Sequence, residues 1–87
     1  MMKVIRNSVG ERGSRIYEQD LRRRLETEEN LGKFLVIDVE TGEYELDEDS
    51  TAATIRARAK HPDHLVYRLR IGYPSTHTIA GPVRRAR

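Results

Sequence analysis

Hydrophobic and polar residues in the middle of the chain follow patterns that predict three β-strands. Residues 33–39 are apolar at nearly every position, which is typical of a central strand covered on both faces. Residues 43–46 alternate acids with Tyr and Leu after a Thr-Gly turn, so the two segments together predict a β-hairpin. Residues 65–71 alternate again, which places apolar side chains on one face and Arg68 and Arg70 on the other.

Two further segments have the periodicity of helices. Residues 14–30 begin at a serine suited to capping a helix and place Tyr17, Leu21 and Leu25 four residues apart, with Ile16 nearby. These four residues form one narrow apolar stripe, which would either lie across a sheet or pair with a second copy of the chain.

The second helix is predicted within residues 47–62. Acids at its start and basic residues near its end complement the helix dipole, and Pro62 ends it. Ala52, Ile55 and Ala59 are expected to form the slim face that sits on the sheet.

The expected fold class is α+β, with an N-terminal helix followed by a β-β-α-β unit. A right-handed crossover through the second helix places the most apolar strand in the centre, so we expect a three-stranded antiparallel sheet in the order 2-1-3 with the helices packed on it. Residues 1–13 contain two glycines and no periodicity, which predicts a flexible arm before a single domain of residues 14–73. Residues 74–87 are rich in proline and arginine and are expected to form a basic C-terminal tail.

Composition limits how this fold can be stabilised. The chain has 87 residues, of which 37% are hydrophobic and 34% charged, so a monomeric core must be small and association with a partner would help. The chain contains no cysteine, which excludes disulfides and thiolate metal sites and fits a reducing compartment. The N-terminal apolar run is too short for a secretory signal, and no window approaches the roughly 20 apolar residues of a membrane span. These features predict a soluble cytoplasmic protein.

Charge is distributed unevenly along the chain. Residues 34–55 contain seven acids and no basic residue, whereas residues 56–87 contain eight basic residues and one acid. Arginines of the second segment, with Tyr73 as a stacking group, could form a surface that binds nucleic acid or an acidic partner. The favoured expectation is that Arg68 and Arg70 pair with acids of the first segment, either within the domain or across a dimer. The candidate residues for this surface are Arg56, Arg68, Arg70, Tyr73, Arg84 and Arg85.

Two short motifs suggest metal chemistry. Asp38 and Glu40 follow an apolar strand with the spacing of the first two metal-binding carboxylates of proofreading exonucleases, but the chain lacks the later carboxylates and the length that such a site needs. A plain turn, with acids facing water, is favoured instead. His61 and His64 could hold a metal if a further ligand approached, but the proline between them favours a solvent-facing turn. We therefore expect no catalytic residue, no metal site and no cofactor.

A resemblance to known proteins covers residues 32–74. It is carried by GKFLVIDVETGEYELDED, an alanine-rich helix, HPDH and VYRLRIGYP, and it is similar to a family of small, uncharacterised bacterial and cyanobacterial proteins. The resemblance supplies no catalytic residues. Proteins of this type occur as small components of two-gene modules, which implies an antitoxin-like or accessory role.

The sequence thus predicts a small non-enzymatic protein-interaction module. Its expected partner is a second copy of the chain, in a homodimer, or another small protein. Binding to a membrane is not expected. The predicted interface is the apolar stripe of Ile16, Tyr17, Leu21 and Leu25. The alternative is an antitoxin-like or accessory nucleic-acid-binding protein that uses the arginine surface.

Overall fold

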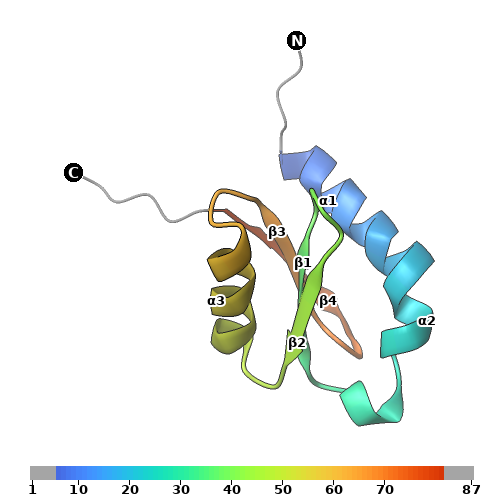
Figure 1. Cartoon of the computed structure of the whole chain (residues 1–87). Coiled ribbons are helices and arrows are strands. Elements are labelled where there is room, and N and C mark those ends of the chain that lie inside the picture. The colour runs from blue at the N-terminus through green and yellow to red at the C-terminus, as the bar shows by residue number, and fades with distance from the viewer. Residues whose placement is uncertain (1–5, 82–87) are drawn as a thin grey trace.

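An antiparallel sheet separates two helical layers in the computed structural model, which describes residues 6–81 (Figure 1). Within these residues the sheet has four strands in the order β2-β1-β3-β4. The strands are β1 (Phe34–Asp38), β2 (Tyr44–Asp47), β3 (Val66–Arg70) and β4 (Tyr73–Ala80). The α+β class and the order of the first three strands are confirmed.

The expectation of three strands and a tail beginning at residue 74 is wrong, because residues 73–80 add a fourth strand beside β3. Pro74 and Gly81 indicated a break in structure, but the last strand of a sheet tolerates proline. The pairing with β3 is regular from Val66↔Ala80 to Arg68↔Thr78 and then shifts register before Arg70↔Tyr73. This bulge absorbs the irregular segment around Pro74. The expected tail beyond residue 81 lies outside the described residues.

The N-terminal layer is one continuous helical segment, followed by a short 3₁₀ turn. Its parts are α1 (Arg6–Ile16), the π-helix η1 (Tyr17–Leu21), α2 (Arg22–Leu25) and the 3₁₀-helix η2 (Glu28–Asn30). The helix therefore begins at Arg6, so a flexible arm over residues 1–13 is wrong for residues 6–13, and residues 1–5 lie outside the description. Among residues 6–81 no helix combines the length and the apolar character needed to cross a membrane.

Gly13 explains why α1 can lie close to the sheet. A Cβ atom at this position would lie 2.2 Å from Cγ of Tyr67 on β3, so only glycine fits here. A Cβ atom on Gly10 would instead meet Ile79 at 3.5 Å, an ordinary van der Waals contact. The glycine that indicated a flexible arm thus serves the packing of a helix.

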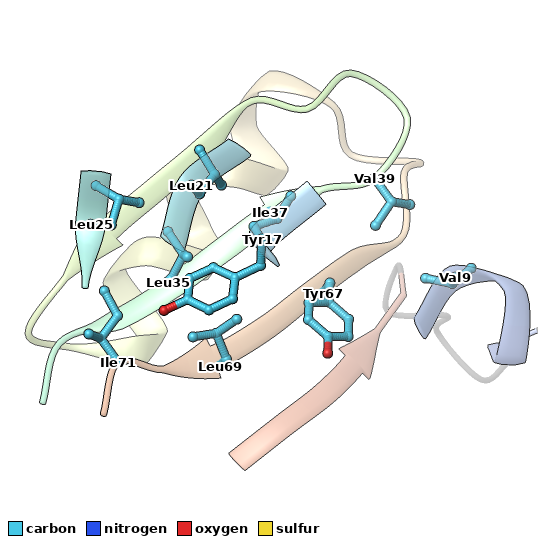
Figure 2. Packing of buried hydrophobic residues seen from close by; sticks show 10 residues of the cluster. All are labelled: Val9, Tyr17, Leu21, Leu25, Leu35, Ile37, Val39, Tyr67, Leu69 and Ile71. Atoms are coloured by element: carbon cyan, nitrogen blue, oxygen red, sulfur yellow. The ribbon is translucent and has the colours of Figure 1, made fainter. Parts of the chain in front are cut away.

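The larger part of the core lies between the N-terminal layer and the sheet. Figure 2 shows side chains of this layer directed at the strands, with Tyr17 lying over Leu35 and Leu69. Because burial of a large apolar side chain contributes about 1.5–3 kcal/mol, this cluster is a main source of stability. The buried residues are Val9, Tyr17, Leu21, Leu25, Leu35, Ile37, Val39, Tyr67, Leu69 and Ile71.

The opposite face of the sheet is covered by α3 (Ser50–Lys60) through small side chains. Ala53 and Ala57 are buried against Val36 and Val66, and alanines at this spacing let the helix lie close to the strands. The expected face of Ala52, Ile55 and Ala59 is wrong, since Ile55 is 62% exposed. Asp49 is the N-cap of the helix, and its carboxylate accepts the backbone N–H of Thr51 at 3.0 Å.

Replacing Gly13 with alanine should destabilise the fold by about 1–3 kcal/mol, because the added methyl group overpacks the contact with Tyr67. Urea unfolding followed by circular dichroism measures the change. Gly10→Ala is the matched control and should be neutral or stabilising by up to about 1 kcal/mol, since alanine favours helix more than glycine. Equal effects of the two substitutions would contradict this account of Gly13.

Candidate functional site

Part of the sheet face under α3 is left open. α3 lies over β1 and β2 and covers the Val66 end of β3, while the arginine-bearing part of β3 and the facing part of β4 border a shallow recess. Alternation along β3 sends Tyr67 and Leu69 to the N-terminal layer and Arg68 and Arg70 to this recess. Its walls combine basic, aromatic and hydroxyl side chains. The residues that line the recess are Phe34, Ser50, Arg68, Leu69, Arg70, Thr76 and Thr78.

Arg70 is held in place by aromatic rings rather than by an acid. Its guanidinium carbon lies 4.2 Å from the ring centre of Tyr73 and 5.1 Å from that of Phe34, within cation–π range. Its Nε donates to the carbonyl of Gly32 at 3.0 Å. Tyr73 itself is 47% exposed, so its ring remains accessible to solvent. The side chain is thus oriented while its charge stays uncompensated by any carboxylate among residues 6–81.

The expected pairing of Arg68 and Arg70 with the acidic segment does not form within the part of the chain that the structure describes. Arg56 takes those acids instead, with its Nε 2.8 Å from Glu45 and its Nη1 2.9 Å from Asp47. Lys60 also reaches Glu45, at 2.8 Å. Hydrogen bonds from Arg56 and Lys60 hold the pKa of Glu45 below its ordinary value.

The structure therefore divides the predicted arginine surface. Arg68 and Arg70 line one recess and Tyr73 stacks on Arg70 at its border, whereas Arg56 is neutralised on α3. Arg84 and Arg85 lie outside the described residues. Phe34 and the three hydroxyl residues of the recess were not among the site residues predicted from the sequence. Alternation along β1, which puts Phe34 on the same face as Val36, would have found the first of these.

The apolar stripe that was predicted to bind a second chain is buried within the fold. Tyr17, Leu21 and Leu25 are 3%, 3% and 8% exposed, because they pack on the sheet of the same chain, and Ile16 is partly buried beside them. Of the two roles that the pattern allowed, lying across a sheet is the one that the structure describes.

A second polar group forms where the β1–β2 turn meets the loop after α3. Asp38 is only 3% exposed, so the expectation that it faces water is wrong, although Glu40 is exposed. One Asp38 oxygen accepts the backbone N–H groups of Glu40 and Thr41, at 2.9 and 3.2 Å. The other lies 2.7 Å from Nδ1 of His64, and this contact raises the pKa of His64.

His61 completes this group, which we term the histidine cluster: Asp38, Glu40, Glu43, His61 and His64. The rings of His61 and His64 stack in parallel with their centres 4.6 Å apart. Nε2 of His61 lies 3.1 Å from Glu43, and Nε2 of His64 lies 3.4 Å from Glu40.

The pairing of Asp38 with His64 had little signal in the sequence. Asp38 precedes the turn residues Glu40 and Thr41, whose backbone N–H groups its carboxylate accepts. This arrangement is typical of an Asx-turn and could have indicated that the carboxylate is fixed. Its partner lies 26 residues further on. Only the tertiary fold brings the two together.

The chain matches no protein-family model, no curated protein and no solved structure. The resemblance carried by residues 32–74 thus stays a prediction, and function must be argued from the geometry of this chain alone.

Arg56→Gln should raise the pKa of Glu45 toward the ordinary carboxyl value, because Arg56 is the main cause of its lowering. The pKa of Asp47 should rise less, because the backbone N–H of Asp49, which lowers it most, remains when the hydrogen bond from Arg56 is lost. A lowered pKa in the folded chain stabilises it above the ordinary value, near about pH 4, and this stabilisation is lost as pH falls through the lowered value. The wild-type chain should therefore have the higher urea midpoint at neutral pH, and the difference should vanish in acid.

Arg23→Gln, on the exposed surface of α2, serves as a control with the same charge change and should show no such pH dependence. A difference between wild type and Arg56→Gln that persists unchanged in acid would contradict the proposed pairing.

Proposed function

We propose that this chain is a non-enzymatic binding module that uses the recess on β3 and β4 to bind single-stranded nucleic acid. The observation that carries the proposal is the position of Arg68 and Arg70. Both lie in the recess, and neither forms an ion pair with another described residue, although the chain holds many acids.

Uncompensated arginines on a sheet suit phosphate groups. A guanidinium offers several N–H donors in a fixed fork that matches phosphate oxygens. Hydroxyl groups of Ser50 and Thr78 line the same recess and can donate further hydrogen bonds to phosphate or sugar. The hydroxyl of Thr76 instead donates to the carbonyl of Tyr73 and holds the start of β4 in place. The recess thus combines charge with hydrogen-bond donors.

The aromatic residues favour a single strand over a duplex. Unstacked bases can lie on aromatic rings or on the plane of an arginine, which is common where sheets bind RNA or single-stranded DNA. Tyr73 is about half exposed and lies next to Arg70, so a base and its phosphate could be bound side by side. Three further arginines follow residue 81 in the sequence and add to the positive charge of this end of the chain.

Fluorescence anisotropy with labelled oligo(U) and oligo(dT) of about 12 nucleotides tests the proposal. We expect binding at about 50 mM salt that weakens as salt rises, with a slope near −0.7 per phosphate contact. Arg68→Gln should weaken binding and reduce the slope by about that amount. Arg70→Gln should weaken binding further, because the stacked guanidinium is lost as well.

Arg23→Gln is the matched control, since it removes the same charge from α2, in the layer that covers the other face of the sheet. It should change affinity little. Absence of binding at low salt, or equal losses in all three variants, would overturn the proposal.

A second candidate function is self-association through β4. Its eight residues, Tyr73–Ala80, contain no Lys, Arg, Asp or Glu, and β4 is the last strand of the sheet formed by residues 6–81. Natural proteins usually protect such a strand with charges, proline or a bulge, or cover it. Pro74 and the bulge protect only the start of β4, and residues 78–80 have none of these features. β2, at the other border, has acids that bind Arg56 and Lys60 of α3. Antiparallel pairing of β4 with its copy would satisfy its outer backbone groups.

Sedimentation velocity at micromolar concentration should then show a dimer. Thr78→Lys should shift the equilibrium to monomer, because an exposed lysine would be introduced into the shared border in both copies. Thr27→Lys, in an exposed loop, should leave the dimer intact. A wild-type chain that sediments as a monomer at every concentration would rule out this function.

A further inference from the structure

The histidine cluster brings three metal-binding side chains to one place. Asp38 stands at the end of β1, and His61 and His64 stand in the loop after α3. One potential ligand atom from each residue lies within 4.8 Å of the other two. A carboxylate and two imidazoles are the ligand types that zinc and related transition-metal ions prefer.

Asp38 is already oriented as a ligand. The backbone N–H groups of Glu40 and Thr41 hold one of its oxygens and leave the other directed at His64. Such hydrogen bonds to the second oxygen fix a metal-binding carboxylate and increase the affinity of a site. Because Asp38 is buried, its carboxylate needs a polar partner in any state of the chain.

The two imidazoles can adjust. Their side chains are 32% and 24% exposed and stand in the loop after α3, outside the buried core. Ligand atoms around a tetrahedral ion with bonds of about 2.1 Å lie about 3.4 Å apart. The rings must therefore leave their parallel stack, the most distant pair of ligand atoms must converge by up to roughly 1.4 Å, and Nδ1 of His64, now 2.7 Å from Asp38, must move slightly away to admit the ion. Glu43, 3.1 Å from His61, is placed to follow as a fourth ligand.

We propose that Asp38, His61 and His64 bind one Zn²⁺ ion, with Glu43 as the fourth ligand. The chemistry differs from the exonuclease pattern first suggested by Asp38 and Glu40, because two imidazoles select a softer ion than Mg²⁺ or Mn²⁺.

The site is independent of the proposed nucleic-acid surface. Asp38 pairs with Val66 at one end of β1, whereas Arg70 pairs with Phe34 at the other end. Loss of either activity therefore need not affect the other.

A bound ion would join the β1–β2 turn to the loop between α3 and β3. The chain has no cysteine, so no disulfide can make such a link. Since the ligands converge only in the folded chain, the ion would stabilise the folded state, and above its dissociation constant this stabilisation grows with the logarithm of the free ion concentration.

Calorimetric titration of the full chain, first freed of metal with a chelator, with zinc chloride tests the site. We expect one ion per chain and a rise in the thermal unfolding midpoint. Cobalt chloride should give the visible absorption of a tetrahedral Co²⁺ complex. Magnesium chloride should give no heat.

His61→Gln and His64→Gln should each weaken zinc binding at least about tenfold and abolish the cobalt spectrum. His77→Gln is the matched control, since the third histidine of the chain packs against Tyr17 and Tyr67 away from the cluster. Circular dichroism of the metal-free variants confirms that each is folded. No zinc binding by the wild-type chain, or undiminished binding by the folded His61→Gln/His64→Gln double variant, would overturn the proposal.

Discussion

The burial of β1 on both faces is the constraint on which the rest of the structure depends. Leu35 and Ile37 face the N-terminal layer and Val36 faces α3, and all three are at most 1% exposed. A strand of this kind cannot lie at a border, so the hairpin partner and β3 must flank it and a helix must cover each face. The two candidate sites lie at opposite ends of β1: the arginine recess is beside Phe34, and the histidine cluster contains Asp38.

Much of this architecture could be predicted because its signals are local or follow from handedness. The run of apolar residues identified β1, alternation identified β2 and β3, and the crossover rule fixed their order. β4 was missed because Pro74 and Gly81 are breakers in most contexts, and only pairing with β3 makes the segment a strand. The start of α1 was missed because Gly13 lowers helix propensity, and its contact with Tyr67 is not visible in the sequence.

The candidate sites were predictable to a smaller extent. Residue types indicated that Arg68, Arg70 and Tyr73 belong to one surface, since β3 and the residues after it bring them together. The choice of ion-pair partner was not predictable, because Arg56 and Arg68 are chemically equal and only the position of α3 over β2 gives the acids to Arg56. The same holds for Asp38, whose neighbours in the turn are local but whose histidine comes from a loop beyond α3.

The π-helical turn at Tyr17–Leu21 accounts for the unusual period of the first helical layer. Its buried positions, residues 9, 13, 17, 21 and 25, recur every four residues, whereas an α-helix turns once in 3.6. In a regular α-helix, side chains four residues apart point in directions that differ by about 40° around the helix axis. Over the four steps from Val9 to Leu25 these differences add up, and the two side chains would face nearly opposite directions. A wider turn contains more residues and takes up part of that rotation. The irregular turn is thus what allows a single helical segment to contact the sheet from one end to the other.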